Sequence, residues 1–298
     1  MTNPYTFSDQ EYYMRRYIND LPKIHPELNI SDDLNNWDDL IEIILKSLPT
    51  SCPNLQQVTC YSDNFNRANT ISLGSPWIEY STDQGSQNAN VLNIASNQIS
   101  ILRNPSQGAP SNTGQPVGAI YGSFLDTLVD QSSSLIFKGI NPVDPSQEVG
   151  PNVTVYIGVG ARLKQRLTGT IWETNTNGYL FEYGHTFSKT SPYAPISGDS
   201  ALVSLYRIEN GGHAILNQIN MPAIAEGTEI RITVANFNPG DFTRACIKCY
   251  FDNTLIFNKT DNSPYLTGRP GIGTINYLSG AGFAILGEDW QGCEMEAI

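Results

Sequence analysis

The sequence has little charge and no long apolar run. Charged residues make up only 15% of the 298 positions, while 40% are hydrophobic. No stretch approaches the roughly 20 apolar residues that a membrane-spanning helix needs, and the first ten residues show no cationic segment followed by an apolar run. We therefore expect a globular chain that neither spans a membrane nor carries an export signal.

Basic residues are scarce relative to acidic ones. The chain has 17 Lys and Arg against 29 Asp and Glu, which gives a formal net charge of −12 at pH 7. Such a chain repels phosphate backbones and anionic lipid surfaces. The balance argues against a nucleic-acid-binding protein and against membrane insertion.

Cysteine is also sparse, with five residues spread over a long chain. An odd, scattered set does not indicate a disulfide framework, although Cys52 and Cys60 could pair locally. Cys246 and Cys249 have the spacing of half a zinc site, but on a strand their thiols point in opposite directions. Buried thiols are the default interpretation for this pair.

Residues 1–60 read as a small helical region. Ser8 and Glu11 form a capping box, and an apolar stripe with helical spacing follows and stops at Pro49. Two short helices bury too little by themselves, so we expect the stripe to dock on the rest of the chain or on a neighbouring subunit. The docking residues are Leu34, Trp37, Leu40, Ile41, Ile44, Leu45 and Leu48.

Residues 61–298 change to β-branched and aromatic runs punctuated by turn residues, which predicts a mainly β, two-sheet sandwich. The sharpest local signal is the Asp252-Asn253 pair, which predicts a tight hairpin. The expected strands are Val91–Ile94, Gln98–Arg103, Ser134–Ile140, Val153–Leu163, Thr168–Glu173, Gly178–Tyr183, Ala201–Glu209, His213–Ile219, Glu229–Phe237, Arg244–Phe251, Thr254–Asn258, Gly271–Tyr277, Gly282–Leu286 and Cys293–Ile298.

Several of these segments resemble a known fold family. Asp63-Asn64-Phe65-Asn66-Arg67-Ala68 with Trp77, and the hairpin Cys249–Phe257, resemble concanavalin-like lectin and glucanase jelly-roll domains of the laminin-G type. The resemblance covers residues 61–298 and implies a jelly-roll sandwich in which Trp77 is a core residue. The form of the opening segment is similar to that in structural proteins of tailed bacteriophages.

That second likeness implies a non-enzymatic virion structural protein that decorates a capsid or tail. It would assemble in the host cytoplasm as a homo-oligomer, bind other virion proteins through the helical region, and adhere to subunits or to host-surface glycans. The alternatives are a soluble glycan-binding lectin and, third, a glycanase-like enzyme. The resemblance identifies a fold more specifically than a function.

The enzyme alternative lacks its motif. Glycanases of this superfamily carry carboxylates that alternate along one strand, and no such Glu-x-Asp string occurs here. The nearest group is Glu294 and Glu296 beside Glu288 and Asp289, which an acidic sheet edge explains equally well. Ser200 with His185 or His213 matches an esterase pattern only superficially, because a strand follows the serine.

Sugar binding by a sandwich needs exposed aromatic faces with polar groups beside them. Large aromatic residues are as often part of the core or of a subunit interface. The candidates, chosen by their expected loop or strand-end positions, are Trp172, Tyr193, Tyr265, Tyr277 and Trp290.

No cofactor is predicted, and the metal question stays open. Calcium is the most plausible ion, because jelly rolls of the resembling superfamily often bind it through loop carboxylates and amides. No calcium-loop string is present. Solvated turn residues are the alternative for every candidate, namely Asp83, Asn88, Asp144, Asp241, Asp261 and Asn262.

Overall fold

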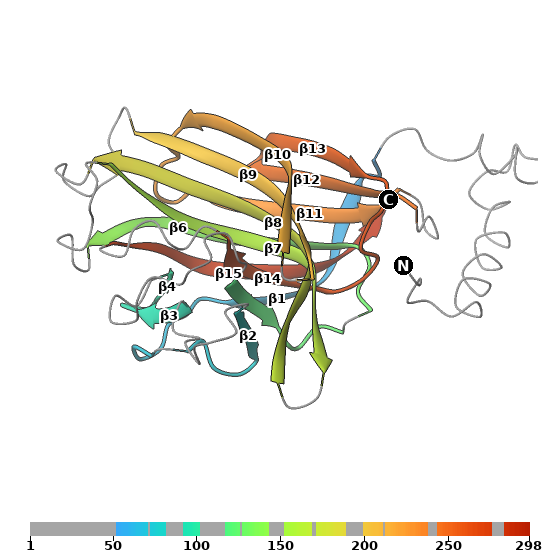
Figure 1. The fold of residues 1–298 in the computed structure, drawn as a ribbon, viewed down its shortest axis with the longest axis horizontal. Coiled ribbons are helices and arrows are strands. Elements are labelled where there is room, and N and C mark those ends of the chain that lie inside the picture. The colour runs from blue at the N-terminus through green and yellow to red at the C-terminus, as the bar shows by residue number, and fades with distance from the viewer. Residues whose placement is uncertain are drawn as a thin grey trace, which may run out of the picture.

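The structure, a computed structural model, describes residues 52–70, 72–81, 92–101, 117–125, 127–142, 152–168, 171–188, 199–210, 212–237, 243–275 and 283–298. These residues form strands and turns, with no helix among them (Figure 1). Accordingly, no described segment is a helix able to cross a membrane. The predicted docking stripe lies outside the described residues.

Two antiparallel sheets build the molecule, and the larger has eight strands. One strand, β1 (Leu55–Asp63), pairs with the C-terminal part of β15, whose N-terminal part pairs with β4. The path of the sheet runs through β13 (Thr254–Asp261), β12 (Ala245–Phe251), β11 (Glu229–Asn236), β6 (Gln131–Pro142), β15 (Phe283–Ala297), β4 (Gln98–Ile101) and β3 (Leu92–Ala95).

The second sheet has seven strands, and its long hairpin of β7 and β8 extends beyond the sandwich in Figure 1. The order across it is β10 (Gly212–Pro222), β9 (Ser200–Glu209), β8 (Ile171–Ser188), β7 (Asn152–Thr168), β14 (Arg269–Thr274), β5 (Val117–Tyr121) and β2 (Trp77–Ser81).

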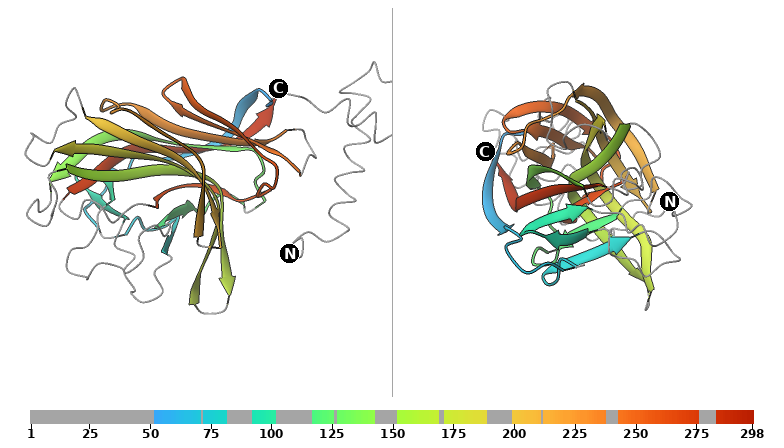
Figure 2. Two further views of the ribbon diagram at one scale, coloured as in Figure 1. Left: turned by 45° about the horizontal axis from the view of Figure 1, so that its top comes forward. Right: turned by 90° about the vertical axis from the view of Figure 1, so that its left-hand side faces the viewer.

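The chain crosses repeatedly between the two layers, which Figure 2 shows stacked on each other. Strands β5, β6 and β7 alternate between the sheets, and so do β13, β14 and β15. Crossings of this kind between two antiparallel sheets characterise a jelly roll. The predicted mainly β jelly-roll sandwich is confirmed.

Alternating side chains fill the space between the layers. In β11, Ile230, Ile232 and Val234 are fully buried. From the facing sheet Phe181 meets Phe251, with ring centroids 5.3 Å apart. Each such burial contributes about 1.5–3 kcal/mol, and the period of two explains why the sequence pattern revealed these strands.

The predicted hairpin is confirmed. Phe251 pairs with Thr254, so only Asp252 and Asn253 form the turn between β12 and β13. Asp252 has a φ of +51°, a conformation that Asp and Asn tolerate better than most residues. Its Oδ1 accepts a hydrogen bond from the backbone N–H of Glu229 at 2.9 Å, which ties the turn to the start of β11.

The beginning of the sandwich differs from the expectation. Strand β1 starts at Leu55, so residues assigned to the helical region belong to the eight-stranded sheet. The expectation that the cysteines form no disulfide framework is wrong as well, because the disulfides are Cys52–Cys246 and Cys60–Cys293, and Cys52 and Cys60 do not pair with each other. Their partners lie 194 and 233 positions apart, and contacts over such separations leave no local sequence signal.

Strand β15 was expected as two separate strands and as an acidic sheet edge. It is instead continuous from Phe283 to Ala297. Its segment Trp290–Glu294 lies between β6 and β1, with Glu294 opposite Gln131 in β6, whereas Glu296 is opposite Gln56 in β1 beyond the last residue paired with β6. The edge interpretation is therefore wrong for Glu294.

A buried polar cluster joins the two sheets where β7 bulges. Arg162 has a φ of +52° and is fully buried. Its Nε donates to Val129 O at 2.8 Å, Nη1 to Tyr265 O at 2.6 Å, and Nη2 to Asn236 Oδ1 at 2.8 Å. A Cβ added to Gly268 would approach the Arg162 backbone to 2.3 Å, so this glycine is needed for close packing.

Candidate functional site

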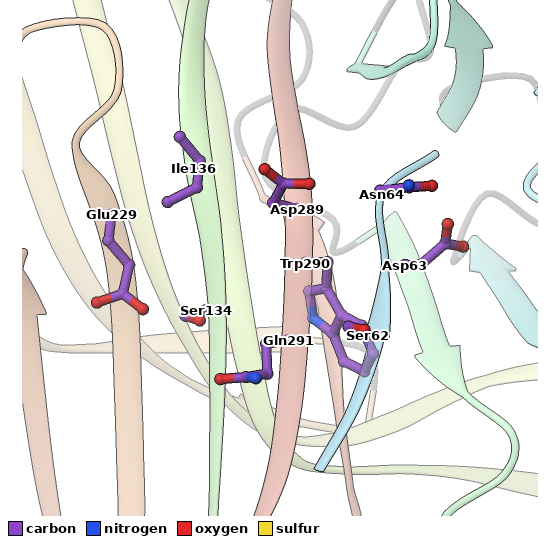
Figure 3. A pocket seen from close by; sticks show the side chains of 9 residues that line it. All are labelled: Ser62, Asp63, Asn64, Ser134, Ile136, Glu229, Asp289, Trp290 and Gln291. Carbon is purple, nitrogen blue, oxygen red and sulfur yellow. The ribbon is translucent and has the colours of Figure 1, made fainter. Parts of the chain in front are cut away.

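A polar pocket opens on the outer side of the eight-stranded sheet. Its volume is about 560 Å³, within the usual range for ligand sites. Figure 3 shows the lining side chains spread over the adjacent strands β11, β6, β15 and β1. They are Ser62, Asp63, Asn64, Ser134, Ile136, Glu229, Asp289, Trp290 and Gln291.

A bulge in β15 shapes this pocket. The register of β15 against β6 shifts between Glu288 and Gln291, and Asp289 has a φ of +48°. Bulges re-aim the side chains of a strand. Here Trp290 is turned into the core and is fully buried, whereas Asp289 stays exposed at the pocket.

One wall is fixed by Asp63 at the end of β1. Its Oδ1 accepts from Phe65 N at 2.7 Å and Arg67 Nη1 at 2.8 Å, and its Oδ2 accepts from Arg67 Nη2 at 2.9 Å and Trp77 Nε1 at 2.7 Å. Partial burial raises the pKa of Asp63, but these hydrogen bonds outweigh it and hold the pKa below its usual value. Asp63 is therefore an ionised anchor whose oxygens are largely occupied by the chain itself.

The opposite wall is formed by Glu229 at the start of β11. Its Oε2 lies 3.3 Å from Arg231 Nη1, and both side chains remain partly exposed. The floor between Glu229 and β15 comes from β6, where Ser134 is buried and Ile136 is half-buried. Outward positions of three neighbouring strands thus supply the middle of the pocket (Figure 3).

The pocket therefore combines carboxylates, amides and hydroxyls around a small apolar floor. Carboxylate oxygens accept hydrogen bonds, and the amides of Asn64 and Gln291 both donate and accept. Such a mixture complements a neutral ligand with several hydroxyl groups. The charges of Asp63 and Glu229 are paired with Arg67 and Arg231, so Asp289 supplies the negative charge that disfavours phosphates and other anions.

Trp290 lacks the exposed ring that was expected of a sugar-binding residue. Its indole is fully buried, so it has no free face for stacking on a sugar ring. Its Nε1 donates to Ser133 Oγ at 2.9 Å, and its rings pack 4.7 Å from Trp77 and 4.8 Å from Tyr121. The core role expected for Trp77 is confirmed, since that residue is buried in the same aromatic cluster.

The other expected sugar-binding aromatic residues are not brought to the pocket. Tyr265 is half-buried, lies against Tyr179, and has the guanidinium of Arg207 4.9 Å above its ring. Trp172 pairs with Leu167 in the β7–β8 hairpin, with its side chain outside the described part. Tyr193 and Tyr277 lie outside the described residues.

Among the expected calcium ligands, Asp261 is engaged by the protein. It accepts from Tyr179 Oη at 2.7 Å and Ser263 N at 2.9 Å, and Arg207 lies 3.4 Å away. Asn262 is exposed in the turn beside it, and the other candidates lie outside the described residues. Within the described ranges, no group of three or more His, Cys, Asp or Glu has a metal-binding arrangement. The calcium question stays a prediction.

The histidine, serine and cysteine residues considered in the sequence analysis occupy the following positions. His185 is fully buried, with Nδ1 2.7 Å from Tyr183 Oη and Nε2 3.1 Å from Asp199 Oδ2. This pairing places the imidazole in the core, whereas Ser200 is exposed. Cys246 is in a disulfide, so its default interpretation as a buried thiol is wrong and it is unavailable for zinc. For Cys249 the default interpretation is confirmed, because it is a free, buried thiol.

Sequence reasoning missed most of the pocket. Of the acidic group near the C-terminus, Asp289 lines it, but Glu294 and Glu296 do not. Glu229, Ser134 and Gln291 were not singled out. Their only signal was their place at outward positions of strands whose neighbours in the sheet were unknown from sequence.

Comparisons with known proteins give structural neighbours and no relatives by sequence. No protein-family model matches the chain, and no curated protein matches it either. A Bacillus subtilis protein of unknown function with a galectin-like fold is 9% identical, with a TM-score of 0.42, and covers 82% of this chain and 100% of its own. A β-1,3-1,4-glucanase from a mouse hindgut metagenome is 12% identical, with a TM-score of 0.39 and coverages of 80% and 99%.

A third neighbour is the carbohydrate-binding module CBM66 from Bacillus subtilis. It is 13% identical, has a TM-score of 0.34, and covers 60% of this chain and 82% of its own. The assignment of the sandwich rests on the strand order and register of this chain, independently of these likenesses.

Proposed function

We propose that this chain is a non-enzymatic adhesion protein that binds a glycan in the pocket between β1, β6, β11 and β15. The observation that carries the proposal is the lining, which places carboxylates, amides and hydroxyls around a space of about 560 Å³. A polyhydroxylated ligand can form hydrogen bonds with such polar groups when it displaces water.

Glycan-array screening followed by titration calorimetry tests this. Gln291→Ala removes both a donor and an acceptor from the β15 side of the pocket, so we expect the Kd to rise about tenfold or more, equivalent to ~1.4 kcal/mol. Asp289→Asn keeps a residue that tolerates positive φ and removes the charge. Glu294→Gln is the matched control, because it changes an exposed acid of β15 outside the pocket. Unchanged affinity in the pocket variants would refute the site.

The same titrations separate adhesion from catalysis. A binding protein leaves the oligosaccharide intact, so we expect no release of reducing ends during prolonged incubation. Turnover that Asp289→Asn abolishes would identify the glycanase-like alternative.

We further propose that this adhesion protein is part of a virion, where it decorates the capsid or tail. The support is the likeness of the Asp63–Ala68 segment to tailed-phage structural proteins. Mass spectrometry of purified virions tests the role directly, and we expect the chain at a fixed copy number. Its absence from particles, together with retained glycan binding by the free protein, would favour the soluble lectin.

A further inference from the structure

One row of paired residues crosses the eight-stranded sheet and runs through the pocket. Gln291 of β15 lies opposite both Ser134 of β6 and Ser62 of β1, and Figure 3 shows these three side chains on adjacent strands. Beyond Ser134 the row continues through Arg231 of β11 and Tyr250 of β12. From β1 to β13 its members are Ser62, Gln291, Ser134, Arg231, Tyr250 and Leu255.

Arg231 and Tyr250 are on the same face of the sheet as the pocket. Arg231 lies between Ile230 and Ile232, which are fully buried in the core. Tyr250 likewise follows the buried core residue Cys249. Successive side chains of a strand point to opposite faces, so Arg231 and Tyr250 point outward.

The pocket covers only one half of this row. Ser62, Gln291 and Ser134 line it, whereas Tyr250 and Leu255 lie outside it. Adjacent strands are about 4.8 Å apart, so the five steps from β1 to β13 span about 24 Å. A ligand that extends from the pocket along the row therefore passes over β11 and β12 to the edge strand β13.

The half outside the pocket offers both polar and apolar contacts. The Arg231 guanidinium lies 4.8 Å from the centroid of the Tyr250 ring. Its Nη1 is 3.3 Å from Glu229 Oε2 and its Nη2 donates to Asp252 O at 3.2 Å, and each of these nitrogens carries a second N–H for a sugar hydroxyl. Beside these donors, Tyr250 is half-buried and Leu255 is 48% exposed. Apolar surface next to hydrogen-bond donors suits the faces and hydroxyls of sugar rings.

We propose that the pocket binds one end of a linear, uncharged oligosaccharide, whose other end lies along the row on Tyr250 and Leu255. This inference rests on the proposed glycan binding and names the class of glycan. A row that crosses the strands in a single line matches an unbranched chain. The charge of Arg231 is paired with Glu229, and Asp289 repels acidic sugars, so an uncharged chain is favoured.

Titration calorimetry with neutral gluco-oligosaccharides of one to six units tests the proposal. The probes are the β-1,4-, β-1,3- and α-1,4-linked series. For at least one series we expect the Kd to fall about tenfold or more from the shortest member that binds to the hexasaccharide. Tyr250→Ala should raise the Kd of the hexasaccharide about fivefold and leave that of the shortest member unchanged, because the short ligand occupies the pocket alone. Leu255→Ala, at an exposed position, is a second variant with the same direction of effect.

Lys248→Ala is the matched control, because Lys248 is on the same face of β12 but in the next row, opposite Thr233 and Asn258. It should leave every Kd unchanged, whereas Gln291→Ala should weaken short and long members alike. Melting temperatures check that each variant is folded.

Three results would overturn the inference while leaving glycan binding in the pocket intact. They are an affinity that does not depend on chain length, a preference for branched or acidic glycans, and an equal loss for the hexasaccharide in Lys248→Ala and Tyr250→Ala. Absence of binding to every glycan would instead refute the proposed function, and the inference with it.

Discussion

Arg162 shows how much of the fold rests on single buried polar residues. It is fully enclosed at a bulge of β7 and donates to groups of three other segments, Val129, Tyr265 and Asn236. Asp130 lies 3.6 Å away, and burial raises the pKa of its carboxyl, although the Asn236 backbone N–H and Arg162 oppose that shift. Such a cluster is stable only when all of its members are present.

We therefore expect replacement of Arg162 to destabilise the folded protein. Arg162→Met leaves two buried carbonyls and the Asp130 carboxylate without their partner, and we expect the free energy of unfolding to fall by about 3–5 kcal/mol. Urea denaturation measures the loss. Lys138→Met is the matched control, because its ion pair with Glu288 is partly exposed and is worth about 0–1 kcal/mol. A similar small loss in both variants would contradict the role of the cluster.

His185 predicts a pH dependence. Burial lowers the pKa of its imidazole, although the neighbouring Asp199 opposes the shift. As the pH falls below the unfolded value of 6.5, the unfolded state takes up a proton that the folded state resists, so the free energy of unfolding decreases. Asp63 acts in the same direction but only near pH 4 and below, because its pKa starts from 3.8.

Unfolding curves between pH 8 and pH 5 check this expectation. The wild type should lose stability below about pH 6.5, and His185→Gln should show a flatter profile over the same window, whatever its absolute stability. His213→Gln is the control, since it changes a histidine on β10 outside the core. An unchanged slope in His185→Gln would assign the effect to other groups.

At the level of elements, β1 is held differently from the other strands. It pairs only with β15 in the described structure, and nearly all of its side chains are exposed. Two disulfides attach β1 covalently in addition to this single strand pairing. Cys60–Cys293 joins β1 to β15, and Cys52–Cys246 links the residues that precede β1 to β12. The strand that carries Ser62 and Asp63 into the pocket is thus attached covalently.

Removing these links should loosen β1 first. The double variant Cys60→Ser/Cys293→Ser is expected to lose about 2–5 kcal/mol of stability, because the closed loop spans most of the chain. Deuterium exchange should rise over residues 55–63 before other strands respond. The control Cys249→Ala removes a thiol that is in no disulfide, and its response to dithiothreitol should equal that of the wild type. An equal rise in deuterium exchange in all strands of the sheet would contradict the expectation that β1 detaches first.

Strand positions were predictable where one face meets the core. The alternation in β11 and the Asp252-Asn253 turn signalled their structures because both signals are local. Strand β1 escaped prediction because its side chains are mostly exposed and it shows little alternation. The division of β15 into two expected strands has a physical reason in the bulge at Asp289, which interrupts the period of two.

At the scale of the whole molecule, the pairing of distant segments decides the site, and sequence does not reveal that pairing. The pocket joins β1 and β15, which stand at opposite ends of the chain, with β6 and β11 from its middle. The resemblance singled out Asp63 and Asn64, which line the pocket, only as part of a contiguous motif of the fold. Glu229 and Gln291 belong to different strands, and only the sheet order brings them together.

The position of the disulfides also sets the boundary for truncation. A chain that starts at residue 51 keeps Cys52, Cys60 and all of β1. A chain that starts at residue 61 loses Leu55–Cys60 of β1 and both disulfides, and it should melt several degrees lower than the chain that starts at residue 51. Thermal denaturation followed by circular dichroism compares the two. Equal melting temperatures would show that β1 is dispensable.

The Cys52–Cys246 bond has a mechanical consequence. Tension applied to the backbone at Cys52 divides between the chain leading into β1 and the cross-link to β12. β1 is then shielded from being peeled off its neighbour one backbone pair at a time, because a second covalent route shares the strain. In the proposed adhesive role, such a tether would resist shear until several strands yield together.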